Sequence, residues 1–407
     1  MEQFGFYAPT RIEFGTGVSG RIANEVSALG ASRVLVITDK GILASGMVEP
    51  LLRQMEQSHI TITLFDAVKS NPRDIDCHKA AALGLEAKVD LVLAIGGGSP
   101  IDTAKAVAAL ITNGGEVKDW VGEQKLHHPT LPLICIPTTA GTGSEVTMFA
   151  VITDAEQNLK TCIADTLIAP ALALVDPGLT MSLPPLLTAS TGIDALTHAI
   201  EAYTCNLHNP VSDALALKAI SLICQNIRQA VEQGENLEAR SNMMLGSLLA
   251  GIAFGNADVA GVHCMAEAIG GLYDIPHGIA NSILLPFVME YNIPAALERH
   301  AEIGRAMGVA PASMPDHEAA AAAVEAVKKL SLDLEIPRFK DLPNVNPDDF
   351  NLLAARAAAN ISAPSNCRPA EPAPPYGDGI HHVRTQVCRS RLTDARQRRR
   401  RMEKFVC

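Results

Sequence analysis

Four short apolar runs, separated by helix-like segments, dominate the first 140 residues of the chain. The runs are rich in β-branched residues and apolar throughout, which is typical of strands buried on both faces of a parallel sheet. They cover residues 33–38, 60–65, 91–95 and 131–136. Because helical patterns separate them, we expect an α/β domain with a Rossmann-like parallel sheet and right-handed crossovers. Residues 146–175 are expected to form one or two hairpins.

The pattern changes near residue 180. Prolines at positions 177, 184 and 185 interrupt the chain, and long helical patterns with almost no strand signal follow. The clearest of them cover residues 189–203, 212–232, 237–251 and 295–307. We therefore expect a Rossmann-like domain at residues 1–180 and an all-α domain at residues 181–362.

The composition is that of a globular protein large enough for two domains. Of the 407 residues, 48% are apolar and 19% are charged, which excludes a disordered chain. No run of about 18 uncharged apolar residues occurs, so no membrane span is expected, and the first residues lack the features of a secretion signal. Nine cysteines are scattered without a CxxC pair, which favours reduced thiols in the cytoplasm.

The net charge of −11 is unevenly distributed. Residues 363–407 hold ten Arg and Lys against four Asp and Glu, so the rest of the chain is strongly acidic. An acidic body argues against nucleic acid as a partner.

A glycine-rich turn follows the third apolar run and precedes a helical pattern. Gly97, Gly98 and Ser99 belong to the string GGGSPIDTAKA. Glycine lets a phosphate approach the backbone closely, and the free N–H groups at a helix start bind its charge. Asp102 suits the first turn of that helix and joins these residues as a candidate for cofactor binding. The turn predicts a site for a nucleotide diphosphate, with a plain strand-to-helix turn as the alternative.

Two further features belong to the same edge of the predicted sheet. Asp39 follows the first apolar run, where a carboxylate can bind an adenosine ribose and repel a 2′-phosphate. This favours NAD over NADP, with an ordinary turn residue as the alternative. The string PTTAGTGSEV at residues 137–146 forms a second polar loop after the fourth run. Since ligands bind at the carboxyl ends of strands, we expect the two loops to flank one cleft.

One carboxylate and three histidines of the second half form a candidate metal site. Asp194 and His198 are four residues apart, so they share a helix face. His263 and His277 follow in the strings GVHCMAE and IPHGIAN. Such a set can bind Fe²⁺, Zn²⁺ or Mn²⁺. From spacing alone, a surface pair and packed histidines are the commoner explanation of such residues.

Four strings, in this order and at these spacings, resemble the iron-containing alcohol dehydrogenase family. They are GGGSPIDTAKA, PTTAGTGSEVT, TGIDALTHAIEAY and IPHGIANSILLP, and the resemblance covers roughly residues 4–360. The lactaldehyde reductase, propanediol dehydrogenase and ethanol dehydrogenase branches are the most similar. The resemblance implies an active site in the cleft between a Rossmann-like and a helical domain. It also implies that a small primary alcohol and its aldehyde are interconverted by hydride transfer to or from NAD(H).

The resemblance also assigns roles to individual residues. It implies a divalent metal, usually Fe²⁺ and in some members Zn²⁺, bound by Asp194, His198, His263 and His277. It implies that the cofactor diphosphate is held by Gly97, Gly98 and Ser99, assisted by Thr139, Thr142 and Ser144. The other positions that match cofactor-lining ones are Asp39, Asn71, Lys160 and Leu179. We expect a homo-oligomer, in the simplest case a dimer.

Glu267 departs from the family pattern. Relatives carry H-x-x-x-H at the third ligand, and the second histidine lies near the nicotinamide and is often credited with proton transfer. Here the string reads HCMAE, from His263 to Glu267. A carboxylate whose pKa is raised by burial can also pass protons, so Glu267 is the candidate catalytic residue. Contact with the metal, contact with a cationic or polar substrate group, and sequence drift without mechanistic meaning are the alternatives.

Residues 363–407 also depart from the family pattern. Relatives end in a helical segment that contains an Asn-Pro-Arg string, whereas here Pro, Arg and Cys rise abruptly and apolar periodicity is lost. Our hypothesis is a reading-frame shift near residue 363 that leaves a disordered tail. A basic appendage for an acidic partner is the alternative.

Other functions compete with an alcohol dehydrogenase. A glycerol-dehydrogenase-like or dehydroquinate-synthase-like protein has a related fold, but the string TGIDALTHAIEAY counts against both. A non-catalytic relative should have lost metal ligands, and all four are present. Short diols, lactaldehyde, ethanol and a charged aldehyde such as sulfoacetaldehyde all remain candidate substrates.

Overall fold

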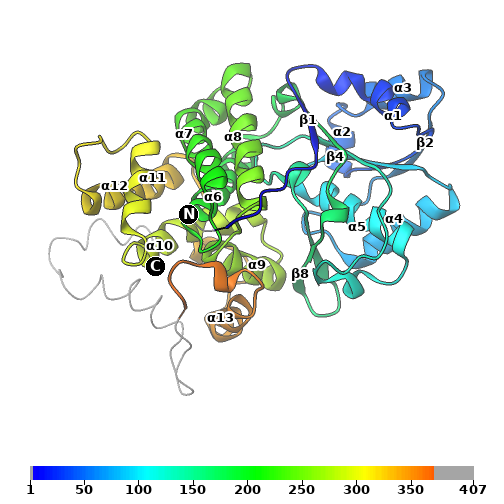
Figure 1. Ribbon diagram of the computed structural model, residues 1–407. Coiled ribbons are helices and arrows are strands. Elements are labelled where there is room, and N and C mark those ends of the chain that lie inside the picture. Colours follow the sequence, from blue (N-terminus) through cyan, green and yellow to red (C-terminus); the bar gives the residue numbers. More distant parts are fainter. Residues whose placement is uncertain (1–2, 371–407) are drawn as a thin grey trace.

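A parallel sheet of six strands forms the centre of the N-terminal lobe in the computed structural model, which describes residues 3–370 (Figure 1). The strands are β1 (Arg11–Phe14), β2 (Arg33–Ile37), β3 (Thr61–Phe65), β4 (Leu91–Gly96), β6 (Leu133–Pro137) and β9 (Leu172–Val175). Four of them correspond to the predicted apolar runs, because side chains that are apolar on both faces need cover on both faces. The predicted α/β class of this lobe is confirmed.

The strand order is β1-β9-β6-β4-β2-β3, and all neighbouring strands are parallel. Counted from β2, this is the 2-1-3-4-5 order of a doubly wound sheet, with β1 added at the edge. The winding reverses between β2 and β4. Ligands of such sheets bind outside the carboxyl ends of the strands at this switch point, so the ends of β2 and β4 are where a cofactor is expected.

Helices cover both faces of the sheet. They are α1 (Ile22–Ala28), α2 (Lys40–Ala44), α3 (Glu49–Gln57), α4 (Asp74–Glu86) and α5 (Gly98–Asn113). Alternate side chains of a strand enter opposite cores. Val34 and Val36 of β2 pack with α1 and α3, whereas Leu35 and Ile37 pack with α4 and α5. The sheet is therefore the middle of three layers, and α5 starts at its carboxyl edge.

A second sheet, in the order β5-β8-β7, belongs to the same lobe. Its strands are β5 (Gly122–Glu123), β7 (Phe149–Asp154) and β8 (Leu159–Ala164). The antiparallel pair of β7 and β8 is the predicted hairpin. The expectation of a second hairpin was wrong for β9, which pairs in parallel with β1 and β6 in the main sheet.

The C-terminal lobe is built from helices, as predicted. They are α6 (Pro185–Thr204), α7 (Pro210–Glu232), α8 (Leu237–Gly255), α9 (Gly261–Tyr273), α10 (His277–Asn292), α11 (Leu297–Ala306), α12 (Asp316–Asp333) and α13 (Phe350–Ala358). α6 is buried along almost its whole length and contacts α7, α8 and α10. Within residues 3–370, no helix combines the length and the apolar character needed to cross a lipid bilayer.

Short 3-10 helices occur in both lobes. They are η1 (Val18–Arg21), η2 (Val117–Trp120), η3 (Ser144–Val146), η4 (Thr166–Ile168), η5 (Pro177–Thr180), η6 (Phe339–Asp341), η7 (Pro347–Asp349) and η8 (Ala363–Ser365). The last strand of the main sheet ends at residue 175 and α6 begins at residue 185, so η5 lies in the connection between the lobes.

The chain continues to pack on the helical lobe beyond residue 362. Asn366 is buried; its Nδ2 donates to Asn292 Oδ1 at 2.9 Å, and its Oδ1 accepts from the backbone N–H of Gly261 at 3.2 Å. The guanidinium of Arg368 lies 4.2 Å from the ring centroid of Tyr291. Placing the start of the atypical tail at residue 363 was therefore wrong, because residues 363–370 belong to the helical lobe. The reading-frame shift near residue 363 stays a prediction, and residues 371–407 of the predicted tail lie outside the described residues.

Candidate metal and nucleotide site

The start of α5 and the loop after β6 lie against each other at the switch point of the sheet. Gly97 is the N-cap of α5, so the unpaired N–H groups of the first turn lie at the carboxyl edge of β4. A Cβ on Gly98 would come within 2.7 Å of Thr142 Cγ2, and one on Gly97 within 3.1 Å of Thr139 Oγ1. The structure thus brings these four predicted cofactor residues together. A side chain at position 98 would clash with Thr142, and one at position 97 would be in tight contact with Thr139.

Ser99, Asp102 and Ser144, three other predicted cofactor residues, hydrogen-bond to other groups of the protein through their side chains. Ser99 Oγ donates to a backbone carbonyl at 2.6 Å. Ser144 Oγ donates to Asp102 Oδ1 at 2.5 Å and accepts from the buried Lys105 Nζ at 3.0 Å. Asp102 Oδ2 accepts from the backbone N–H of Val151 at 3.0 Å. Ser144 and Asp102 thus join the loop after β6 to α5 and β7, whereas Ser99 joins α5 to the loop after β3.

Asp39 and Leu179 lie at the same edge of the sheet but have structural partners. Asp39 is the N-cap of α2, and its Oδ1 accepts from the backbone N–H of Ile42 at 2.9 Å. A carboxylate has a second oxygen, so this cap does not exclude a bond to a ribose. Leu179 packs against the core between the sheet, α1 and α3.

Two predicted cofactor residues of the N-terminal lobe reach the helical lobe. Asn71 is buried, and its Nδ2 donates to Asp274 Oδ1 at the end of α9 at 2.7 Å. Lys160 of β8 lies beside α9, where a Cβ on Gly270 would be 3.3 Å from Nζ. Both residues therefore lie where the two lobes meet.

Four side chains from α6, α9 and α10 converge in the helical lobe. Asp194, His198, His263 and His277 each offer one ligand atom, and these atoms lie within 4.8 Å of one another. Asp194 Oδ1 is 3.8 Å from His277 Nε2 and 4.0 Å from His263 Nε2. Such separations fit ligands that share one divalent ion at about 2.0–2.2 Å. The cluster predicted from sequence is thus present as one oxygen and three nitrogen donors.

Burial sets the protonation of this cluster. It lowers the pKa of His198 to about 4 and lowers that of His277 well below its ordinary value. Burial alone would raise the pKa of Asp194, but the three imidazoles, His198 first, lower it overall. Near neutral pH, His198 and His277 are therefore neutral imidazoles and Asp194 is an ionised carboxylate, which are the forms that bind metal. Burial would also lower the pKa of His263, but its hydrogen bond to Glu201 raises it overall.

Among the four residues of the cluster, His277 is the most exposed to solvent. The side chain of His277 is 26% exposed, whereas those of Asp194 and His263 are 2% and 3% exposed. The ring of Phe254 stacks on His198 with 4.4 Å between centroids and 16° between planes, which fixes that imidazole and excludes water behind it. An open position beside buried ligands is what a catalytic metal site requires.

The loop after β6 connects the glycine turn to the metal cluster. A Cβ on Gly141 would come within 2.7 Å of Thr191 Cβ on α6, one turn before Asp194. Gly143 has φ 60°, and a Cβ there would come within 2.5 Å of Gly251 Cα on α8. Since the same loop touches Gly98 through Thr142, it lies between the predicted diphosphate site and the ligand-bearing helices.

Sequence reasoning missed two residues of the cluster, Glu201 and Asn281. Asn281 is completely buried; its Nδ2 lies 3.1 Å from Nε2 of His263 and of His277 and donates to Asp194 Oδ1 at 2.5 Å. Glu201 contacts the other side of His263. Helical spacing could have found both, because Glu201 is three residues after His198 and Asn281 four residues after His277.

Comparison with known proteins decides the family. The profile described as iron-containing alcohol dehydrogenase matches residues 9–177, and the C-terminal profile of the Fe-containing alcohol dehydrogenase family matches residues 188–380. The chain is 40% identical over 368 residues to the 1,3-propanediol dehydrogenase of Klebsiella pneumoniae, covering 90% of this chain and 95% of that protein. The chain belongs to the iron-containing alcohol dehydrogenase family. It is therefore an oxidoreductase of the alcohol dehydrogenase type.

Two solved structures share the fold of this iron-containing alcohol dehydrogenase. A 1,3-propanediol oxidoreductase matches with a TM-score of 0.88 at 38% identity, covering 93% of this chain and 98% of that one. The sulfoacetaldehyde reductase of Bifidobacterium kashiwanohense in complex with NAD⁺ matches with a TM-score of 0.81 at 29% identity, covering 91% and 96%. The C-terminal profile runs past residue 363, in agreement with the packing of residues 363–370.

Glu267, the departure from the family pattern, lies on α9 one turn after His263. Its Oε2 accepts from Asn360 Nδ2 at 2.6 Å. Burial raises the pKa of Glu267, and the positive charge of Lys160 opposes this effect. In this alcohol dehydrogenase, the carboxylate thus lies among α9, β8 and the chain after α13, part-buried at the contact of the two lobes.

Proposed function

We propose that this alcohol dehydrogenase depends on a divalent metal and uses NAD(H) to interconvert a small primary alcohol and its aldehyde. One observation carries the proposal: the loop of residues 137–146 contacts the glycine turn through Thr142 and α6 through Gly141. Hydride transfer needs the nicotinamide next to the polarised carbon. A single loop that touches both half-sites supports this arrangement.

The donor set fits a divalent metal at Asp194, His198, His263 and His277. We propose Fe²⁺, in keeping with the family name, with Zn²⁺ and Mn²⁺ as alternatives, because imidazole and carboxylate ligands suit all three ions. A metal bound there would supply Lewis acidity to the substrate oxygen. The lowered pKa values of His198 and His277 keep these two imidazoles neutral, which is the form that binds metal. The ring of Phe254, stacked on His198, excludes water from that side.

The cofactor assignment rests on the α/β lobe. The N-terminus of α5 provides N–H groups and a positive dipole end for a diphosphate, and Gly97 and Gly98 leave the backbone accessible. Asp39 at the end of β2 favours NAD over NADP, because a carboxylate there repels a 2′-phosphate. The structural relative crystallised with NAD⁺ gives further support.

The substrate is proposed to be a short alcohol or diol and its aldehyde. The curated relatives include a 1,3-propanediol dehydrogenase. Glu267 adds a negative charge near His263, which gives an anionic aldehyde such as sulfoacetaldehyde no advantage over a neutral one. All four ligands are in place, which argues against a non-catalytic relative.

We also propose a homo-oligomer, in the simplest case a dimer, in the cytoplasm. The segment before β1 exposes three aromatic side chains, with Phe4 46%, Phe6 39% and Tyr7 51% exposed. A group of exposed aromatic residues is typical of a protein contact. The seven cysteines within the described residues are free thiols, as in a reducing compartment.

A single assay tests the catalytic proposal. Purified protein is loaded with Fe²⁺ without oxygen, or with Zn²⁺, and mixed with NADH and a panel of small aldehydes. NADH oxidation by at least one aldehyde is expected, and it should disappear when a chelator removes the metal. No turnover with any aldehyde and either metal would contradict the proposal.

A further inference from the structure

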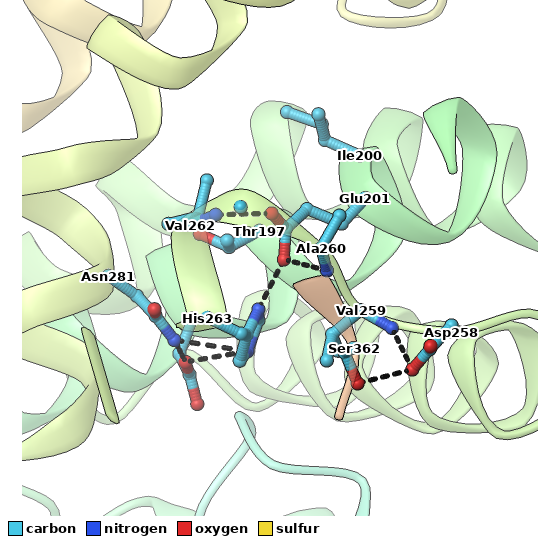
Figure 2. Close-up of polar contacts among 12 residues, drawn as sticks. Thr197, Ile200, Glu201, Asp258, Val259, Ala260, Val262, His263, Asn281 and Ser362 are labelled. Atoms are coloured by element: carbon cyan, nitrogen blue, oxygen red, sulfur yellow. Dashed lines mark hydrogen bonds and ion pairs between the residues drawn. The ribbon is translucent and has the colours of Figure 1, made fainter. Parts of the chain in front are cut away.

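Glu201 accepts three hydrogen bonds at the start of α9. It lies on α6 one turn after His198 and is only 3% exposed. Its carboxylate accepts from the backbone N–H groups of Ala260 at 2.9 Å and Val262 at 2.6 Å, and it contacts His263 Nδ1 at 2.5 Å (Figure 2). Ala260 is the N-cap of α9 and makes no side-chain cap of its own. The cap of α9 is therefore provided by another helix.

The two contacts of His263 define its tautomer. Nδ1 faces the Glu201 carboxylate, which can only accept a hydrogen bond, so Nδ1 carries the proton. Nε2 lies 3.1 Å from the amide nitrogen of Asn281, which can only donate. Nε2 therefore carries the lone pair of the ring, which accepts from Asn281 here and faces the side of Asp194 where a metal would bind. Nδ1 of His198 and of His277 makes no hydrogen bond to a side chain in the described part of the chain.

We propose that Glu201 is the positioning residue of the metal centre, which holds His263 in its metal-binding tautomer and orientation. Metal-ligating histidines commonly donate their other N–H to a carboxylate, which fixes the ring and raises its basicity. Glu201 also ties the first turn of α9 to α6, so the ligands of these two helices move together. The inference rests on the proposed metal site and adds to it the residue that fixes its geometry.

Asp258 supplies a matched control. It lies two residues before Ala260 and is also a carboxylate with three donors. Figure 2 shows two of them, Val259 N–H at 2.8 Å and Ser362 Oγ at 2.9 Å, and the third is Ser365 Oγ at 2.5 Å. It contacts none of the four ligands among the interactions of the described residues. Asp258→Asn therefore disturbs a similar network without changing what faces His263.

The test compares Glu201→Gln and Asp258→Asn with the wild-type protein. Zn²⁺ affinity is measured by competition with a chromogenic chelator, and the coordination sphere by the visible absorption spectrum of bound Co²⁺. Glu201→Gln is expected to weaken Zn²⁺ binding by about 10- to 100-fold and to change the Co²⁺ spectrum. Asp258→Asn should keep the wild-type affinity and spectrum, even if both variants unfold at a lower temperature.

A double-mutant cycle with His263→Ala completes the experiment. Once the imidazole is gone, Glu201→Gln should cause no further loss of Zn²⁺ affinity, because the two residues act as one unit. Wild-type affinity and spectrum in Glu201→Gln would overturn the proposal, and so would equal losses in both carboxylate variants. If the wild-type protein binds no Zn²⁺, the proposed metal centre is wrong. If the wild type and Glu201→Gln bind Zn²⁺ equally well, the metal centre stands and only the positioning role of Glu201 is wrong.

Discussion

The proposed metal ligands and the proposed cofactor contacts belong to different lobes, so single substitutions should separate their roles. His263→Ala and His277→Ala each remove one donor from the cluster. We expect turnover to be abolished, whereas NADH binding, followed by fluorescence titration, should stay close to that of the wild type. Substantial turnover in either variant with added metal would contradict the ligand assignment.

The effect of Asp39 on cofactor choice can be tested with a substitution that keeps the N-cap of α2. Asp39→Asn keeps a side-chain oxygen for the N-cap of α2 and removes the charge. Use of NADPH relative to NADH should rise, because a carboxylate about 4 Å from a 2′-phosphate costs about 1–4 kcal/mol. The measurement is kcat/KM with both cofactors. An unchanged ratio would mean that Asp39 only caps the helix.

Glu267 can be tested by a pair of substitutions. Glu267→Gln keeps the size and the bond to Asn360 but removes the titrating proton. If Glu267 transfers protons, this variant should lose about 10²-fold in kcat, the low end of general acid–base contributions. Glu267→His restores the family residue and should stay active with a shifted pH profile.

The opposite results for Glu267 are equally informative. If the carboxylate contacts the substrate instead, both variants should mainly raise KM, and Glu267→His should improve on neutral alcohols. If both variants match the wild type in kcat, KM and pH profile, the glutamate has no role in catalysis.

The role of a single residue could be predicted from the sequence only where a short motif around that residue indicated it. The four ligands follow from family strings and helical spacing, and they do converge. The inward side chains of Asp102 and Ser144 could not be predicted, because Lys105 and Val151 become their partners only when β7 packs on α5. The role of Glu201 was missed for the same reason.

At the scale of elements, a pair of glycines lets the backbones of the two lobes approach each other closely. A Cβ on Gly251 of α8 would lie 2.8 Å from Gly143 Cα and 2.9 Å from its carbonyl oxygen. Gly251→Ala should therefore push the loop after β6 away from α8. We expect a loss of about 1–3 kcal/mol in the free energy of unfolding and a higher KM for NADH, because the same loop touches Gly98.

Gly255→Ala is the control for this experiment. It lies one turn further along α8, where a Cβ would be 3.6 Å from Thr147 Cγ2, an ordinary contact. Urea unfolding and NADH kinetics should leave this variant close to the wild type. Equal effects of the two substitutions would show that the glycine pair has no special importance.

Elements were predictable where their signal was local. The four apolar runs and the long helices carry their pattern within a few residues, and the structure has them. β1 is a four-residue strand whose side chains are partly exposed, RIEF, so its alternation is weak. Its place in the sheet depends on β9, far along the chain. The packing of Asn366 depends likewise on α9 and α10, so composition alone placed the end of the helical lobe too early.

At the scale of the whole molecule, metal binding should stabilise the helical lobe. The ligands come from α6, α9 and α10, so unfolding this lobe destroys the site. Zn²⁺ at about 100 times its Kd should add about 2.7 kcal/mol to the free energy of unfolding. Calorimetry should show a higher Tm with Zn²⁺ and its return to the starting value after chelation. Zn²⁺ should raise the Tm of His277→Ala much less than that of the wild type. An equal rise in this variant would mean that the stabilising ion binds at another site.

The pairing of β1 with β9 also has a consequence for how the protein is made. Residues 11–14 leave the ribosome first, but their partners are residues 172–175. β1 therefore has no partner while the elements between β1 and β9 are synthesised. The sheet can be completed once β9 has emerged. All four proposed metal ligands lie further along the chain, and domains fold largely as units during synthesis. A growing chain can thus complete its six-stranded sheet before the first of the proposed metal ligands has emerged.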